Sequence, residues 1–193
     1  MSTLDFSGRK GKPVVVVGSL NMDLVMRTPR VPVGGETLHG HEFSTLPGGK
    51  GANQAVACAR LGAKVAMIGQ VGNDGFGTTL RDGLAADGID VNGVLQTSAV
   101  GTGVAMILVE DIGQNRIVLA AGANGALTPD DIDAQTALIG GAAMVVLQLE
   151  VPMPVVERAI AIAHNAGVPV LLNPGPAKPL AEALWSQIDI LIP

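Results

Sequence analysis

Short apolar runs alternate with segments of helical periodicity along most of the chain. Residues 14–17 are four valines followed by Gly18, a pattern typical of a strand buried on both faces of a parallel sheet. Residues 51–61 carry small and apolar side chains at helical spacing up to Gly62, and residues 64–71 return to strand character. Two further helices and two further strands are predicted over residues 76–86 and 154–166, and over residues 143–149 and 168–172. This alternation predicts an α/β fold with a mainly parallel sheet flanked by helices.

Two stretches interrupt the alternation and have the period-two pattern of strands. They span about residues 24–46 and 94–119, and the second contains the run 102–109 followed by turn residues at 113–115. We predict that these insertions pair as a small separate sheet. Such a sheet is well placed to act as a lid over a site at the carboxyl edge of the main sheet.

Composition favours one compact domain, because 48% of the 193 residues are hydrophobic and a chain of this length can bury a sizeable core. Residues 1–12 are polar and are predicted to be a flexible leader, which leaves residues 13–193 as the domain. The apolar run at 188–192 is typical of a strand with no helix after it. We therefore expect an α/β domain that is incomplete at its carboxyl end.

Charge and cysteine content exclude several classes of protein. Lys and Arg total 12 against 17 Asp and Glu, and aromatic residues make up 2% of the chain, which argues against a nucleic-acid surface. Cys58 is the single cysteine, and no apolar run approaches the roughly 20 residues of a membrane span. We expect a soluble cytoplasmic protein with no membrane partner. His39 and His41 lack a recognisable metal spacing, so no metal site is predicted.

Asn21 and Asp23 are the first candidates for chemistry. They follow the first predicted strand and stand two residues apart, so their side chains project to the same side of an extended chain. Ligands of open α/β sheets bind outside the carboxyl ends of the strands, where an amide and a carboxylate are suited to neighbouring hydroxyls. A simple turn is an equally weighted interpretation of this pair, because Asn and Asp favour turns.

The stretch P-G-G-K-G-A-N-Q at residues 47–54 is the most informative. Three glycines precede or open a helix, and Lys50 in its first turn opposes the helix dipole, so a ligand outside the helix is the better explanation. Free backbone amides there would bind an anion or hydroxyl oxygens. The Walker pattern fails because Gly51 follows the lysine, and residues 72–77 reverse the spacing of a dinucleotide fingerprint.

Glu150 follows another predicted buried strand and so faces the same edge of the sheet. On position alone, a solvated acid in a loop is the simpler interpretation.

Several segments together closely resemble the ribokinase and fructokinase-type family of sugar kinases. They are G-S-L-N-M-D at 18–23, G-G-K-G-A-N-Q-A at 48–55, A-G-A-N at 121–124, Q-L-E at 148–150 and N-P-G-P-A at 173–177. The likeness covers the chain from about Val14 to Pro193. It implies a Rossmann-like, ribokinase-like α/β domain with a β-sheet lid, and a homodimer that forms through the lid.

The resemblance also implies a reaction and a site. The reaction is transfer of the ATP γ-phosphate to the primary hydroxyl of a sugar with Mg²⁺, and D-ribose, giving ribose 5-phosphate, is the expected substrate. A monovalent cation is a further cofactor that the family admits. The implied substrate-binding residues are Asn21, Met22, Asp23, Gly49, Lys50, Gly51, Ala52, Asn53 and Glu150.

The chain departs from the family's pattern at its carboxyl end. Family members continue after the proline that matches Pro193 into an N-x-x-E segment near the metal and the phosphates, and later into a G-A-G-D segment whose aspartate is the catalytic base. We therefore expect no catalytic residue or metal ligand within these 193 residues, with the base and the main ATP and Mg²⁺ contacts beyond Pro193. Negligible kinase activity is expected from this chain alone.

Two other functions stay open. One is a non-catalytic, sugar-binding or regulatory short form, which a transcript extending beyond Pro193 would exclude. The other is a fructose or nucleoside kinase relative, which the K-G-A-N-Q segment at 50–54 disfavours.

Overall fold

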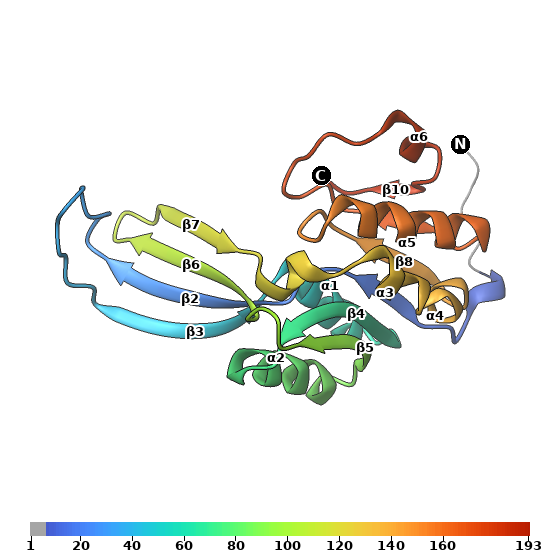
Figure 1. Cartoon of the computed structure of the whole chain (residues 1–193), viewed down its shortest axis with the longest axis horizontal. Helices are drawn as coiled ribbons and strands as arrows, with labels where there is room; N and C mark the ends of the chain where they lie inside the picture. The colour runs from blue at the N-terminus through green and yellow to red at the C-terminus, as the bar shows by residue number, and fades with distance from the viewer. Residues whose placement is uncertain (1–6) are drawn as a thin grey trace.

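The structure is a computed structural model that describes residues 7–193, and it contains two β-sheets (Figure 1). Six strands form the large sheet in the order β10-β9-β8-β1-β4-β5, and every neighbouring pair in it is parallel. Four strands form the small sheet in the order β3-β2-β6-β7. The predicted parallel α/β sheet with a second, smaller sheet is confirmed.

The elements have the following bounds. The large sheet consists of β1 (Val14–Val17), β4 (Val65–Gly72), β5 (Asp90–Thr97), β8 (Met144–Leu147), β9 (Val170–Leu172) and β10 (Ile190–Leu191). The small sheet, which we call the lid, consists of β2 (Asn21–Thr28), β3 (Glu42–Gly48), β6 (Gly103–Glu110) and β7 (Asn115–Ala120). The helices are η1 (Ser7–Arg9), α1 (Lys50–Arg60), α2 (Gly75–Ala86), η2 (Gly122–Ala126), α3 (Pro129–Asp133), α4 (Thr136–Gly140), α5 (Met153–Asn165) and α6 (Glu182–Trp185).

Strand β1 lies between β4 and β8 in the large sheet, and this central position explains why its sequence is four successive valines. Val15 and Val17 pack in one hydrophobic cluster with residues of α5, whereas Val16 packs in a second cluster with residues of α1 and α2. All three side chains are fully buried. Since successive side chains of a strand point to opposite faces, an uninterrupted apolar run serves a strand that is covered on both faces.

The lid projects away from the large sheet, as Figure 1 shows. Its central strands, β2 and β6, pair in parallel, and β3 and β7 flank them antiparallel. The second insertion begins later than predicted, because residues 94–97 belong to β5 and pair with β4 in the large sheet. Residues 29–41 of the first insertion form no strand, since two prolines and the Gly34–Gly35 pair interrupt them.

The described part of the predicted leader is not loose. Residues 1–6 lie outside the described residues, and Ser7–Arg9 forms the short helix η1. The Arg9 guanidinium donates to the carbonyl oxygen of Ala142 at 3.0 Å and to that of Gly167. Two loops of the α/β domain therefore hold this segment.

Asp74 joins the start of α2 to the base of the lid. Its carboxylate accepts hydrogen bonds from the Gly77 amide at 2.8 Å, from the Thr102 amide at 2.8 Å and from the Thr102 hydroxyl at 2.7 Å. Burial alone raises the pKa of Asp74, but these hydrogen bonds outweigh it and leave the pKa below its ordinary value of 3.8. The carboxylate form therefore stabilises the fold.

Asp74→Asn is expected to lower the free energy of unfolding by about 1 kcal/mol at neutral pH, because the helix loses its charged cap. The pKa is lower in the folded chain, so this stabilisation is fully present above the unfolded value and is lost as the pH falls through the folded value. Urea titrations between pH 7 and pH 3 measure the difference, which should narrow toward the acid end. Asp82→Asn, on the exposed side of the same helix, is the control; an equal loss in both variants would contradict the role of the cap.

No helix within residues 7–193 combines the length and the apolar character that crossing a membrane requires.

Candidate functional site

Six of the predicted substrate-binding residues line one crevice at the base of the lid. The crevice has a volume of about 210 Å³, and the lid strands β6 and β7 form its other wall. The six residues are Asn21, Asp23, Gly49, Lys50, Asn53 and Glu150. It lies beyond the carboxyl ends of β1 and β8, where open α/β sheets bind their ligands.

Strand β2 positions the first two of these side chains. Asn21 and Asp23 are alternate residues of β2 and therefore point to the same face, as predicted. Gly48 stands next to them on β3, and a Cβ atom at Gly48 would lie 2.3 Å from a carboxylate oxygen of Asp23. Glycine at this position leaves room for the Asp23 carboxylate beside the strand.

Glu150 is bound at the amino terminus of α1. One of its carboxylate oxygens accepts hydrogen bonds from the Ser19 hydroxyl at 2.6 Å and from the Lys50 amide at 3.0 Å. The Gly51 amide donates to the Ser19 hydroxyl oxygen at 3.3 Å, and the Ala52 amide donates to the Ser19 carbonyl oxygen at 3.0 Å. A carboxylate here also interacts favourably with the helix dipole, which Lys50 opposes.

These contacts correct one expectation. Backbone amides in the stretch 47–54 were predicted to be free for an anion or hydroxyl oxygens, but Ser19 and Glu150 already accept from the amides of residues 50–52. The anion at this helix is therefore an internal carboxylate. What α1 offers to a ligand is the side chains of Lys50 and Asn53, both of which are exposed.

The other three predicted residues do not line the crevice. Met22 and Ala52 are buried in the hydrophobic cluster beneath α1 and α2. Gly51 packs against the backbone of β1's end, where a Cβ atom would lie 2.7 Å from the carbonyl carbon of Gly18. These three residues therefore pack around the crevice and do not form part of its lining.

The two carboxylates of the crevice affect each other. Burial, and secondarily the charge of Glu150, raise the pKa of Asp23 above its ordinary value of 3.8. Ionisation of Asp23 therefore lowers the stability of the folded chain. A ligand hydroxyl that donates a hydrogen bond to this carboxylate would offset the free-energy cost of its desolvation.

The apolar wall of the crevice was missed by the sequence analysis. It consists of Ala105 and Ile107 of β6 and Ile117 and Leu119 of β7. Ala105 pairs with Leu119 and Ile107 with Ile117, so the four side chains share one face of the lid. The period-two pattern of residues 102–109 contained this face, but nothing in it indicated which face turns toward the crevice.

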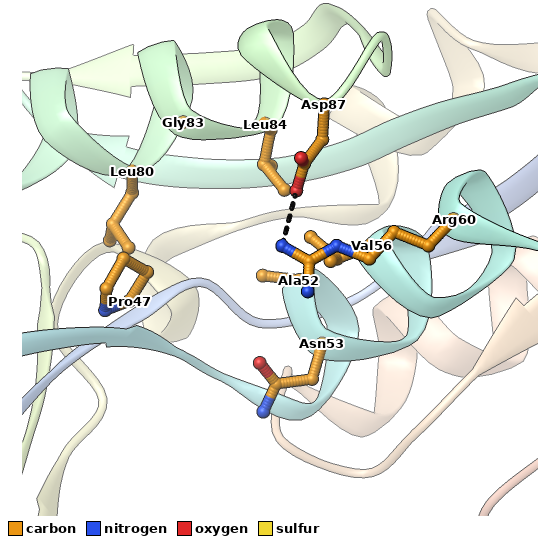
Figure 2. Close-up of a pocket in the computed structure, with 9 residues that line it drawn as sticks. All are labelled: Pro47, Ala52, Asn53, Val56, Arg60, Leu80, Gly83, Leu84 and Asp87. Atoms are coloured by element: carbon orange, nitrogen blue, oxygen red, sulfur yellow. Dashed lines mark hydrogen bonds and ion pairs between the residues drawn. The ribbon is translucent and has the colours of Figure 1, made fainter.

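Figure 2 shows a second groove, between α1 and α2, with a volume of about 300 Å³. Pro47, Leu80 and Leu84 form part of its apolar lining, and Arg60 pairs with Asp87 across it at 3.4 Å. Asn53 lines both this groove and the crevice, so the two are separated by the first turns of α1.

A third groove lies where α1 leaves β8 and β9 uncovered. Its apolar lining includes Met144, Val146 and Leu171, together with the half-buried Cys58. Burial raises the pKa of the Cys58 thiol.

Within residues 7–193, no group of three or more His, Cys, Asp or Glu side chains is placed to hold a metal ion.

Comparisons with known proteins agree with the fold. The model of the pfkB family carbohydrate kinases matches residues 12–193. Ribokinase from Schizosaccharomyces pombe is 49% identical over 93% of this chain and 58% of the relative, and ribokinase from Haemophilus influenzae is 44% identical over 94% and 60%. The structure of Arabidopsis thaliana ribokinase complexed with ribose and ATP superposes with a TM-score of 0.86 at 34% identity, covering 93% of this chain and 59% of that one.

The chain thus spans about three fifths of the length of the curated relatives it matches. The family match covers nearly all of the chain, and the parallel sheet with a second small sheet accords with the solved relatives. The chain belongs to the pfkB family of carbohydrate kinases.

Proposed function

We propose that this chain is the sugar-binding part of a ribokinase-type kinase, which phosphorylates D-ribose to ribose 5-phosphate with ATP. The observation that carries the proposal is the convergence of Asn21, Asp23, Gly49, Lys50, Asn53 and Glu150 on one crevice. The ribose-bound Arabidopsis relative supports the choice of sugar.

The lining of the crevice suits a small polyol. Asp23 and Glu150 provide carboxylate oxygens that accept from hydroxyls, and Lys50 and Asn53 provide donors. Ile107 and Leu119 present an apolar surface on the opposite side, which suits the C–H face of a sugar ring. Polar groups therefore fix the orientation of the sugar while apolar groups exclude water.

The phosphate half of the reaction remains a prediction. Phosphoryl transfer requires positioning, charge stabilisation and a carboxylate that accepts the hydroxyl proton. We expect the base, Mg²⁺ and most ATP contacts to involve residues that follow Pro193 in longer family members. ATP, when bound, would supply the phosphoryl group; the residues described here bind and orient the sugar.

We also propose that the lid forms a homodimer contact. The apolar surface that the lid exposes supports this proposal. Three of its large apolar side chains, Phe43, Met106 and Val118, are 57%, 55% and 72% exposed. Contiguous exposed apolar surface on a small sheet is typical of a protein interface.

Calorimetric titration of the 193-residue chain with D-ribose, without nucleotide, tests the proposal. The chain is expected to bind ribose saturably, and Asn53→Ala to lower the affinity about tenfold through the loss of one hydrogen bond. Arg60→Ala is the matched control, because Arg60 lies on the same helix but lines only the groove of Figure 2. A chain that melts cooperatively yet gives no ribose signal would refute ribose binding, and binding without phosphate transfer by a longer, complete protein would favour a regulatory sugar-binding role.

A further inference from the structure

Asn124, in the A-G-A-N segment, is buried at the base of the lid and contacts the crevice through another residue. It is 1% exposed. Its side-chain oxygen Oδ1 accepts from the backbone amide of Leu20 at 2.9 Å. Its nitrogen Nδ2 donates to the carbonyl oxygen of Leu20 at 2.9 Å and to Oδ1 of Asn21 at 2.8 Å. The Asn124 side chain therefore has a partner for its oxygen and for both amide hydrogens.

The backbone of Leu20 permits only one orientation of this amide. A backbone N–H group only donates and a backbone carbonyl only accepts, so Oδ1 of Asn124 must face the Leu20 nitrogen and Nδ2 must face the Leu20 oxygen. Exchanging the two atoms would place donor against donor and acceptor against acceptor in a buried position. Such unpaired buried groups are costly.

The orientation of Asn124 in turn determines that of Asn21. The remaining hydrogen of Asn124 Nδ2 points at Asn21, so the atom of Asn21 that receives it must be the oxygen. The nitrogen Nδ2 of Asn21 makes no hydrogen bond with any residue between 7 and 193, and Asn21 lines the crevice. Asn21 therefore offers a donor to a ligand.

Gly103 provides the space for this contact. It opens β6, beside Asn21 in the lid. A Cβ atom at Gly103 would lie 2.3 Å from both Oδ1 of Asn21 and Nδ2 of Asn124. Three segments far apart in the sequence thus meet around one hydrogen bond.

We propose that Asn124 is a positioning residue that sets the donor and acceptor polarity of the sugar site. It holds Asn21 with its nitrogen toward the ligand, two residues from Asp23, whose carboxylate only accepts. The pair recognises a hydroxyl group that accepts from Asn21 and donates to Asp23, or two adjacent hydroxyls that divide these roles. An amine or an ether oxygen fits the pair less well, because neither an ammonium group nor an ether can both accept and donate. This inference rests on the proposed sugar-binding function.

Asn124→Asp is the sharpest variant. An aspartate at this position still accepts from the Leu20 amide but has no hydrogen for Asn21, so Asn21 turns its nitrogen toward the new carboxylate and its oxygen toward the crevice. Asn21→Asp also presents an oxygen there. Both variants are expected to lower D-ribose affinity at least tenfold in calorimetry, and Asn124→Asp with unchanged affinity in a cooperatively melting chain would overturn the proposal.

A double-mutant cycle separates positioning from general stability. Asn124→Ala is expected to lower ribose affinity about fivefold to tenfold in the wild-type background, but by less than twofold when Asn21→Ala is already present. A residue with a merely structural role would lower affinity equally in both backgrounds, and that result would overturn the proposal.

Nuclear magnetic resonance of the wild-type chain without any sugar tests the orientation itself. Both side-chain amide hydrogens of Asn124 should exchange slowly with water, and those of Asn21 should exchange faster. The reverse order would overturn the proposal. If the expected order appears but ribose does not bind, the orientation stands and the proposed sugar ligand fails, so the two failures are distinguishable.

Discussion

Gly51→Ala is expected to lower the free energy of unfolding by about 3 kcal/mol and to abolish ribose binding. A Cβ atom there would lie 2.7 Å from the carbonyl carbon of Gly18 and from the nitrogen of Ser19, and these are backbone atoms that cannot turn aside. The first turn of α1 would have to move away from β1. That movement would also break the hydrogen bonds that Glu150 and Ser19 accept from α1, so overpacking and unpaired polar groups add together.

Urea denaturation and ribose calorimetry measure the two effects. Gly83→Ala is the matched control, because Gly83 lies within α2 and a Cβ atom there would have nothing within 4 Å. That change should raise stability by about 0.5 to 1 kcal/mol, as alanine favours a helix over glycine. Equal losses in the two variants would show that the close approach of α1 to β1 is not the cause.

Asp23→Asn is expected to lower D-ribose affinity about 100-fold while raising the melting temperature at pH 7. The lost affinity reflects a hydrogen bond to a charged group, at about 1.5 to 3 kcal/mol. The gain in stability follows from the pKa of Asp23, which burial and the charge of Glu150 raise above 3.8. The folded chain therefore disfavours the ionised form, and an amide removes that cost.

The difference in melting temperature between Asp23→Asn and wild type should depend on pH in a definite direction. Because the folded pKa of Asp23 exceeds the unfolded one, the cost of ionisation is fully present above the folded value and is relieved as the pH falls toward 3.8. The melting temperatures of wild type and Asp23→Asn should therefore converge on acidification. Glu150→Gln is the contrast: Glu150 accepts from Ser19 and Lys50, so its neutral variant should melt lower than wild type at pH 7. Asp23→Asn melting below wild type at that pH would contradict the assigned cost.

Local patterns predicted the centre of the large sheet well because β1, β4 and β8 are buried on both faces. The valines of β1 and the apolar run of β8 can be recognised without knowledge of their neighbours. The lid was harder. Val94 and Leu95 look like lid residues in the sequence, yet they pair with β4, and a period-two pattern does not tell which sheet a strand joins.

The candidate site was predicted in part for a similar reason. Residue type and position relative to a strand end made Asn21, Asp23 and Glu150 candidates but left a turn or a solvated loop acid open, and the family resemblance decided between these interpretations. The role of Glu150 as the carboxylate that accepts from the start of α1 could not be predicted in this way, because it depends on a contact between residues 100 positions apart in the sequence. Asn124 likewise acts across 103 positions, and no local pattern encodes such a contact.

The pairing of β2 with β6 has a consequence for the order of folding. Asn21 pairs with Gly103, so forming the centre of the lid closes a loop of about 80 residues, at an entropic cost that grows with the logarithm of loop length. Strands β1, β4 and β5 and their helices lie within or beside that loop, and their folding brings its ends together in advance. The lid should therefore assemble after β1, β4 and β5 have paired, as contacts distant in sequence form late when nearer ones can form first. A chain with a weakened core would lose its lid, whereas a chain with a weakened lid would keep its core.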